Sequence, residues 1–183
     1  FNSISTTLEF CNNYELDKDY LKAKEDLGYP DDPNIFRLDL GVENPLSKIL
    51  RDNGFKVDNT GGEDLDIDRT SILQSKASVV TAFQIFEHLT NPFQVLKEIK
   101  SDKLVCSIPL RLWFSSAYRN RNDERDNHFH EFEDWQFRLL LKKTGWNIID
   151  EKKFTNPVKK FGFRPILRLF TNRYLIIYAE KIK

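Results

Sequence analysis

Three histidines and a glutamate, placed in two short segments, could carry chemistry in this chain. Glu87 and His88 come directly after an apolar, β-branched run at 78–83, and His128 and His130 stand two apart just before an apolar helical pattern. An imidazole titrates near neutral pH and can take a proton from a hydroxyl or an amine. His88, His128 and His130 are therefore predicted to be catalytic. The alternative is structural. Glu87 and His88 would then brace the loop between strand and helix, and one ring of the His128/His130 pair would cap the next helix or pack on Trp135.

The segment 111–130 is rich in aromatic and arginine residues and could hold the molecule on which the histidines act. Aromatic rings supply contact area, and guanidinium groups bind anions through two parallel hydrogen bonds. Arg111, Trp113 and Tyr118, together with Glu87, are therefore predicted to bind the substrate.

Strand and helix signals alternate around these residues. Runs at 78–83 and 103–110 read as strands, and between them Asn91 can cap a helix that has Pro92 at its first position. Two strands joined through a helix in this way form a parallel pair. Another apolar strand is expected at 35–40. Polar groups that follow such strands lie at the carboxyl edge of the sheet, where open α/β sheets bind their ligands.

Together these pieces resemble the class I S-adenosylmethionine-dependent methyltransferases, in particular the methyltransferase type 11 and ubiquinone-methyltransferase group. That family has an Asp/Glu-x-Gly-x-Gly-x-Gly loop after its first strand and an Glu-His-Leu-x-(Asp/Asn)-Pro phrase after its fourth. The matching residues are Asp39, Gly41, Glu87-His88-Leu89, Asn91-Pro92, Leu96, Glu98-Ile99, Ser107 and Pro109. The resemblance covers roughly residues 35–183.

The resemblance implies an α/β fold: a three-layer αβα sandwich with a Rossmann-like methyltransferase sheet, mostly parallel with an antiparallel last strand at 173–183. We expect a single methyltransferase-like domain over 1–183. It would carry an N-terminal helical extension at 1–34, with a helix at 14–28, and an acceptor-side insertion at 111–130.

One interval is shorter than the family pattern requires. From Gly41 to Val79 there are only 79 − 41 = 38 residues. Three crossovers of about a dozen residues and two strands of about five need more than that. We therefore expect an element between 62 and 77 to be shortened.

The implied cofactor is S-adenosylmethionine, held where the glycine loop lets the backbone approach closely. Two later glycine positions of that loop are occupied by Glu43 and Pro45. A loop that no longer binds the cofactor is therefore the alternative. The predicted cofactor-binding residues are Asp39, Gly41, Asp58, Phe83, Gln84 and Phe86. The acidic stretch at 58–68 is equally compatible with a solvated loop.

No metal site is predicted. In ubiquinone-type O-methyltransferases a Glu-x-x-Glu-His group holds a divalent cation, whereas this chain has Gln84-x-x-Glu87-His88. An amide is a poorer ligand than a carboxylate for a hard cation. The pair of His128 and His130 also has the spacing of metal ligands, but the sequence shows no clear third ligand beside it.

Composition bounds the partners. Lysine and arginine number 28 and so do aspartate and glutamate, so the net charge is zero and no general attraction to nucleic acid is expected. Residues 152–173, with seven basic side chains and no acid, favour an anionic acceptor or partner, or else form a solvated basic face. No membrane span is visible, and two cysteines suit a reducing, cytoplasmic setting. The sequence does not indicate an oligomeric state.

Three functions are consistent with these features. The first is S-adenosylmethionine-dependent methyl transfer to a small-molecule acceptor, which could be anionic. The second is a non-catalytic methyltransferase-like domain that binds a partner through its basic, aromatic segments. The third is an RNA methyltransferase, which only the basic segment favours.

Overall fold

The computed structural model describes residues 36–52, 56–155, 167 and 170–182. The expected N-terminal extension at 1–34 and most of the basic segment at 152–173 lie outside the described residues. In the described part the strands are β1 (Phe36–Asp39), β2 (Lys56–Asn59), β3 (Val79–Phe83), β4 (Lys103–Pro109), β5 (Trp146–Phe154) and β6 (Tyr174–Lys181). The helices are α3 (Pro45–Asp52), α4 (Thr70–Gln74), α5 (Pro92–Glu98) and α6 (Asp134–Lys143), with a 3₁₀ turn η1 (Glu124–Asp126).

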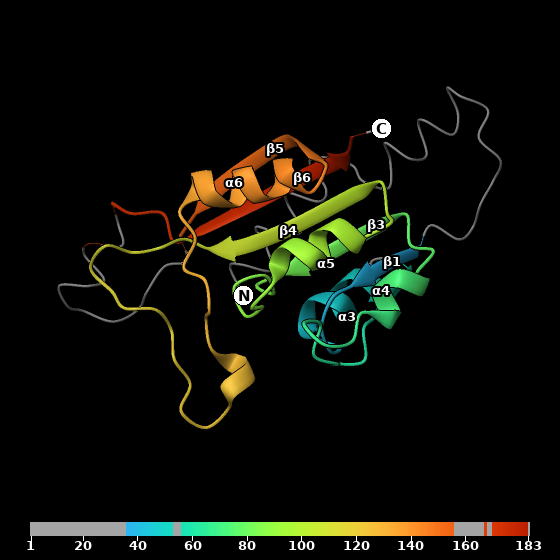
Figure 1. Cartoon of the computed structure of the whole chain (residues 1–183), viewed down its shortest axis with the longest axis horizontal. Helices are drawn as coiled ribbons and strands as arrows, with labels where there is room; N and C mark the ends of the chain where they lie inside the picture. Colours follow the sequence, from blue (N-terminus) through green and yellow to red (C-terminus); the bar gives the residue numbers. More distant parts are fainter. Residues whose placement is uncertain (1–35, 53–55, 156–166, 168–169, 183) are drawn as a thin grey trace. The chain divides into compact units, whose positions relative to one another are not determined.

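The strands form one sheet in the order β2-β1-β3-β4-β6-β5 (Figure 1). The pairs β1–β2, β1–β3 and β3–β4 are parallel, whereas β6 is antiparallel to both β4 and β5. A mostly parallel sheet with an antiparallel last strand was predicted from the sequence, and the structure confirms it.

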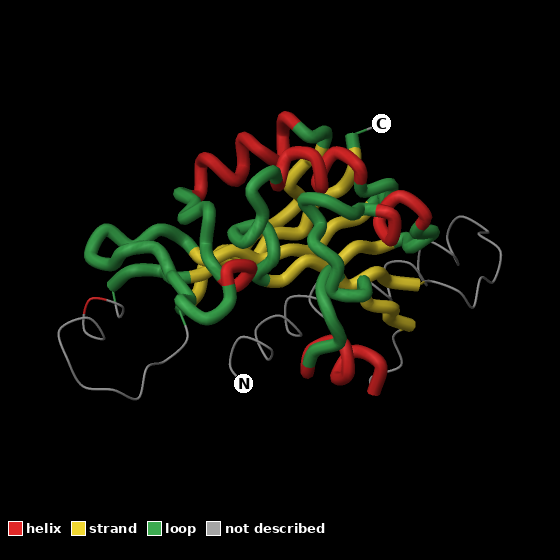
Figure 2. Tube along the Cα trace, turned by 60° about the horizontal axis from the view of Figure 1, so that its bottom comes forward, coloured by secondary structure: helices red, strands yellow, loops and turns green. Residues whose placement is uncertain are grey.

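Helices cover both faces of the sheet (Figure 2). The chain moves from β1 to β2 in one direction along the sheet, and from β2 through β3 and β4 to β5 in the other. Because crossovers between parallel strands are right-handed, α3 lies on one face, and α4, α5 and α6 lie on the other. The expected three-layer αβα arrangement follows.

The connection from β2 to β3 is short, as the residue count predicted. It contains the five-residue helix α4, and no strand is found in it, although every residue from 56 to 83 is described. The parallel half of the described sheet therefore ends at β2, and the segment 60–69 runs directly past the carboxyl ends of the strands.

Local signals explain where the helices begin and end. The side chain of Asn91 accepts a hydrogen bond from the backbone N–H of Gln94 at 3.3 Å, and Pro92 opens α5. Helix α6 ends before Gly145, whose φ of +86° is the left-handed conformation that terminates helices. No helix in the described ranges is long and apolar enough to cross a membrane.

The core between the sheet and α5 and α6 is apolar and closed. Phe86, Phe137, Leu141 and Trp146 are each at most 1% exposed, and the indole N–H of Trp146 donates to the carbonyl of Leu96 at 3.1 Å. Burying each such side chain contributes about 1.5–3 kcal/mol. This packing holds α5 and α6 against the sheet and so fixes the strand ends.

Candidate functional site

Gly41, just after β1, needs to be glycine. Its φ is +107°, and a Cβ added there would lie 3.3 Å from Cδ1 of Ile85. Its backbone N–H donates to the hydroxyl of Thr60, just after β2, at 2.7 Å. The backbone of the β1 loop therefore passes close to both neighbouring strand ends.

Asp39, the last residue of β1, is 1% exposed and organises this loop. Its carboxylate accepts hydrogen bonds from the hydroxyl of Thr81 at 2.6 Å and from the side-chain amides of Asn44 and Asn59, each at 3.0 Å. Burial raises the pKa of Asp39, and the hydrogen bonds oppose that rise. The two side-chain amides therefore connect Asp39 to the loop and to β2.

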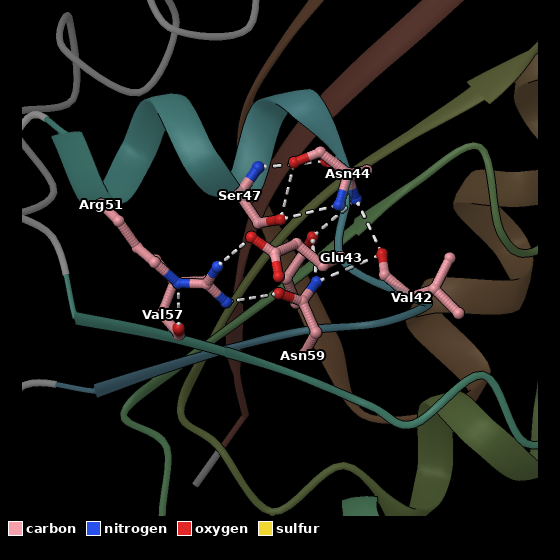
Figure 3. Close-up of polar contacts among 8 residues, drawn as sticks. Val42, Glu43, Asn44, Ser47, Arg51, Val57 and Asn59 are labelled. Atoms are coloured by element: carbon pink, nitrogen blue, oxygen red, sulfur yellow. Dashed lines mark hydrogen bonds and ion pairs between the residues drawn. The ribbon is translucent and has the colours of Figure 1, made fainter.

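Glu43 stands where the family has a glycine, yet it does not enter the space in front of the strands. Its carboxylate pairs with Arg51 of α3 at 2.8 Å, and the Glu43 side chain is 65% exposed. Arg51 also donates to the side chain of Asn59 at 2.7 Å and to the carbonyl of Val57 at 2.8 Å (Figure 3). The ion pair thus connects the β1 loop to β2 from the outside.

Asn44 and Ser47 fix the remainder of the loop. The backbone N–H of each residue donates to the side-chain oxygen of the other, both at 3.0 Å (Figure 3). This reciprocal cap starts α3, and Pro45, in the other vacated glycine position, is the first helical residue. Polar side chains therefore shape a loop that glycines shape in the family pattern.

A cavity of about 570 Å³ opens in front of the carboxyl ends of β1, β2 and β3. Among the predicted cofactor residues, Gly41, Phe83 and Gln84 line it. The other lining residues are Leu40, Val42, Asn44, Thr60, Gly62, Glu63, Asp64, Leu65, Asp66, Ile85, His88, Leu89, Thr90, Asp123, Glu124, Arg125, Asp126 and Phe129.

Three predicted cofactor residues do not line this cavity. Asp39 lies beneath the β1 loop and holds it through hydrogen bonds from Asn44 and Asn59. Asp58 is exposed on the edge strand β2. Phe86 is fully buried, with its ring centroid 5.7 Å from that of Phe137, because the chain turns into the core after Ile85. Direct contacts of Asp58 and Phe86 with a ligand in this cavity have no support in the structure.

The cavity wall is strongly acidic. Among the described lining residues there are six carboxylates and one guanidinium, that of Arg125, which donates to the carbonyl of Gly62 at 3.3 Å. The carboxylates are those of Glu63, Asp64, Asp66, Asp123, Glu124 and Asp126. The site is thus suited to a ligand that carries positive charge.

Asp66 is structural as well as acidic. Its two carboxylate oxygens accept the backbone N–H groups of Thr90 at 2.7 Å and Asn91 at 2.9 Å. Partial burial would raise the pKa of Asp66, but these hydrogen bonds outweigh it and lower the pKa. Asp66 therefore connects the acidic segment to the start of α5.

A second group of residues, Glu87, His88 and His128, gathers beside the cavity; we call it the Glu–His–His cluster. The carbonyl of Glu87 accepts the backbone N–H groups of Phe129 at 2.8 Å and His130 at 3.1 Å. These bonds dock the segment 127–130 against the turn after β3. The rings of His88 and His128 consequently meet edge to face, with centroids 4.9 Å apart.

The carboxylate of Glu87 is unusual. The residue is 0% exposed, and neither side-chain oxygen accepts a hydrogen bond from another described residue. Burial raises the pKa of Glu87 to about 8, with the charge of Glu131 adding to the rise. The carboxylate therefore lacks the partner that buried charges normally have.

Both imidazoles of the cluster are held from outside it. Nδ1 of His88 lies 3.1 Å from the carbonyl oxygen of Asn127, and Nδ1 of His128 lies 2.9 Å from a carboxylate oxygen of Glu131. Burial, followed by the neighbouring His128, lowers the pKa of His88. Burial of Glu131 opposes its ionisation, but the bond from His128 and the nearby Arg173 lower its pKa overall.

The other predicted acceptor-side residues separate into two groups. Tyr118 packs on His128, with ring centroids 5.1 Å apart. His130 instead stacks on Phe132 at 5.2 Å. Arg111 pairs with Glu133 at 3.3 Å, and Trp113 is 75% exposed; neither lines the cavity. His128 and Tyr118 therefore lie with Glu87 and His88. His130, Arg111 and Trp113 lie apart from them.

Parts for Glu131 and Thr60, and the joint geometry of the Glu–His–His cluster, were not predicted from the sequence. Glu131 follows His128 by three residues, and that spacing was a usable signal for a carboxylate–imidazole pair. One ligating atom from each of Glu87, His88 and His128 lies within 4.8 Å of the others. His128 therefore lies with Glu87 and His88, and His130 is not part of this group.

Solved structures resemble this chain in fold. A SAM-dependent methyltransferase from Methanosarcina mazei aligns with a TM-score of 0.60 and 12% identity, covering 85% of this chain and 96% of that one. For a SAM-dependent methyltransferase from Archaeoglobus fulgidus the TM-score is 0.55, with 12% identity and coverage of 88% and 92%.

A third structure carries ligands. The 1,6-didemethyltoxoflavin-N1-methyltransferase of Burkholderia thailandensis, solved with 1,6-didemethyltoxoflavin and S-adenosylhomocysteine, gives a TM-score of 0.52 and 15% identity, covering 100% of this chain and 90% of that one. No protein-family model and no curated protein sequence matches this chain. Strand order, the antiparallel last strand and these similarities agree: the chain has the fold of the class I S-adenosylmethionine-dependent methyltransferases.

Proposed function

We propose that this protein binds S-adenosylmethionine in the cavity in front of β1, β2 and β3 and transfers its methyl group to a small acceptor. The observation that carries the proposal is the cavity itself, which opens where the backbone of Gly41 approaches Thr60 and Ile85. The Burkholderia thailandensis structure contains S-adenosylhomocysteine in the same fold, which supports this cofactor.

The substitutions in the glycine loop are compatible with binding. Glu43 turns outward to Arg51 and is not among the described residues that line the cavity, and Pro45 takes the first position of α3. This observation weakens the case for a domain that has lost its cofactor. The acidic wall also suits a sulfonium cofactor, because its positive charge would be attracted by the surrounding carboxylates.

The Glu–His–His cluster would serve the acceptor side of the reaction. His88 lines the cavity and His128 contacts His88, so a hydroxyl that enters beside them could pass its proton to a neutral imidazole as the methyl group is transferred. Transfer itself depends mainly on aligning the acceptor with the methyl group. His130 faces Phe132 and Thr90 and has no supported part in this step.

A neutral or cationic acceptor fits the described cavity better than an anionic one. Arg125 is the one arginine or lysine among the lining residues that the structure describes, and six of those residues carry carboxylates. Arg111, which was predicted to bind the substrate, pairs with Glu133 outside the cavity. RNA, with a phosphate at every residue, is disfavoured on the same ground.

Calorimetric titration of the protein with S-adenosylhomocysteine tests the proposal. One saturable site is expected, and adenosine alone should bind more weakly because it lacks the amino-acid end. The control is Glu43→Ala, which removes an exposed ion pair worth at most about 1 kcal/mol and leaves the cavity wall unchanged. No binding at millimolar concentration would overturn the proposal and leave the non-catalytic domain as the better explanation.

Methyl transfer is tested separately. The protein is incubated with S-adenosylmethionine and either a set of small hydroxyl and amine compounds or total RNA, and the formation of S-adenosylhomocysteine is followed. Turnover with small compounds is expected. Turnover with RNA alone would contradict the acceptor class proposed here.

A further inference from the structure

We propose that Glu87, His88 and His128 form a binding site for one divalent transition-metal ion, with Zn²⁺ as the best match. Their ligating atoms, one from each side chain, lie within 4.8 Å of one another. Two imidazoles and one carboxylate suit Zn²⁺ and related first-row ions, and three protein ligands leave room for a further ligand. Binding needs neither cofactor nor acceptor, so the inference stands apart from the proposed function.

The hydrogen bonds around the cluster prepare both imidazoles as ligands. Nδ1 of His88 faces the Asn127 carbonyl oxygen, which can only accept, so this nitrogen carries the proton and Nε2 keeps its lone pair. Nδ1 of His128 faces the carboxylate of Glu131 in the same manner. Histidines that bind metal ions almost always donate their second N–H to a carbonyl or carboxylate in this way.

The carboxylate of Glu87 supplies the second line of evidence. It is fully buried, and no other described residue donates a hydrogen bond to either of its oxygens. A buried carboxylate without a partner is costly, and proteins normally provide a cation or several donors for it. A metal ion between Glu87 and the two imidazoles would be such a cation.

The ligand set differs from the one that the sequence pattern suggested. The side-chain amide of Gln84 donates to the hydroxyl of Ser107 at 3.1 Å, so Gln84 is engaged with β4. The third ligand comes instead from His128, which the Glu87 carbonyl holds in place through the neighbouring N–H of Phe129. With two imidazoles in place of a second carboxylate, the site favours Zn²⁺ over the harder Mg²⁺.

The site lies beside the cavity because His88 lines it. A metal ion held by three protein ligands would keep a position free for a further ligand. A hydroxyl group bound at that position loses its proton more readily. In the metal-bound protein the two imidazoles would therefore act as ligands, and the ion would take over the activation of the acceptor.

The test is calorimetric titration with ZnCl₂, with the visible absorption of Co²⁺ as a second probe, on the full chain in a Cys11→Ser background that removes a competing thiol. One equivalent should bind. His128→Ala and Glu87→Gln should each weaken binding at least 100-fold, and Glu131→Gln by about 10–100-fold. The matched control is His130→Ala, from the same segment but stacked on Phe132, which should bind as the parent does.

Each contrary result is decisive. An absence of saturable Zn²⁺ and Co²⁺ binding would overturn the proposal, as would His128→Ala binding with the parent affinity or His130→Ala weakening binding equally. Binding of Mg²⁺ without Zn²⁺ would overturn the choice of ion class. If circular dichroism shows that a ligand variant is unfolded, the Co²⁺ spectrum of the parent decides, because nitrogen ligation changes it from that of the aqueous ion. Intact S-adenosylhomocysteine binding without metal binding would remove this inference and leave the proposed function standing.

Discussion

Replacing Gly41 with alanine tests where the cofactor lies. A side chain at a φ of +107° is strained, and such strain costs about 1–3 kcal/mol. The new Cβ would also lie 3.3 Å from Cδ1 of Ile85, so one of the two must move by a few tenths of an ångström. We expect the free energy of unfolding to fall by about 2 kcal/mol.

Ligand binding should suffer as well, because Gly41 and Ile85 both line the cavity. Relief of the strain moves the loop and weakens the 2.7 Å hydrogen bond from the N–H of Gly41 to Thr60, which contributes about 1 kcal/mol. The movement of the cavity wall at Gly41 and Ile85 weakens binding further. S-adenosylhomocysteine should therefore bind at least tenfold more weakly, a change of about 1.4 kcal/mol in binding free energy.

The matched control is Gly145→Ala, measured by urea unfolding and by calorimetry with S-adenosylhomocysteine. Gly145 also has a left-handed φ, +86°, but no atom lies within 4 Å of its added Cβ and it is not a cavity residue. This variant should lose about 1–2 kcal/mol of stability and keep its affinity. If Gly41→Ala lost stability but bound the ligand as the wild type does, the cofactor would not lie at this loop.

Three further outcomes are expected. Asp66→Asn should lower the free energy of unfolding by about 1 kcal/mol at pH 7. Because the pKa of Asp66 is lowered in the folded protein, its contribution to stability is present above about pH 4 and fades below it. Urea unfolding of the variant and the wild type should therefore give the same stability in acid. Burial raises the pKa of the Cys106 thiol, so in a Cys11→Ser background DTNB should react with Cys106 only on unfolding; prompt reaction would contradict its burial. Trp146→Phe should cost about 2 kcal/mol, since it removes the hydrogen bond to the Leu96 carbonyl and leaves a cavity; an unchanged midpoint in urea would contradict that packing.

The elements of the fold were predictable because their signals are local. The cap at Asn91, the proline after it and the β-branched runs on either side determine β3, α5 and β4 within about thirty residues. The number of residues between Gly41 and Val79 likewise predicted the shortened connection before β3. The mostly parallel sheet with its antiparallel last strand was implied by the resemblance, whereas the strand order came from the structure.

The site was less predictable because it depends on contacts between distant residues. The bond from Thr81 to Asp39 spans 42 positions, and the bond from His88 to the carbonyl of Asn127 spans 39. No local pattern indicates that Gln84 adopts a φ of +57°, which aims the chain from β3 into the core at Phe86. The three-dimensional partners of Glu87 were therefore invisible in the sequence.

The loop after β1 has a consequence for how such chains diverge. In a glycine loop each glycine acts independently, and a single substitution removes the backbone freedom at that position. Here the same turn depends on a network of hydrogen bonds. The Asp39 carboxylate accepts hydrogen bonds from the side-chain amides of Asn44 and Asn59, and the side-chain oxygen of Asn59 accepts one from Arg51. Changes at these positions should be non-additive in double-mutant cycles. Chains that share this loop are then best detected by correlated pairs of polar residues, since a motif that requires glycines at positions 43 and 45 would overlook them.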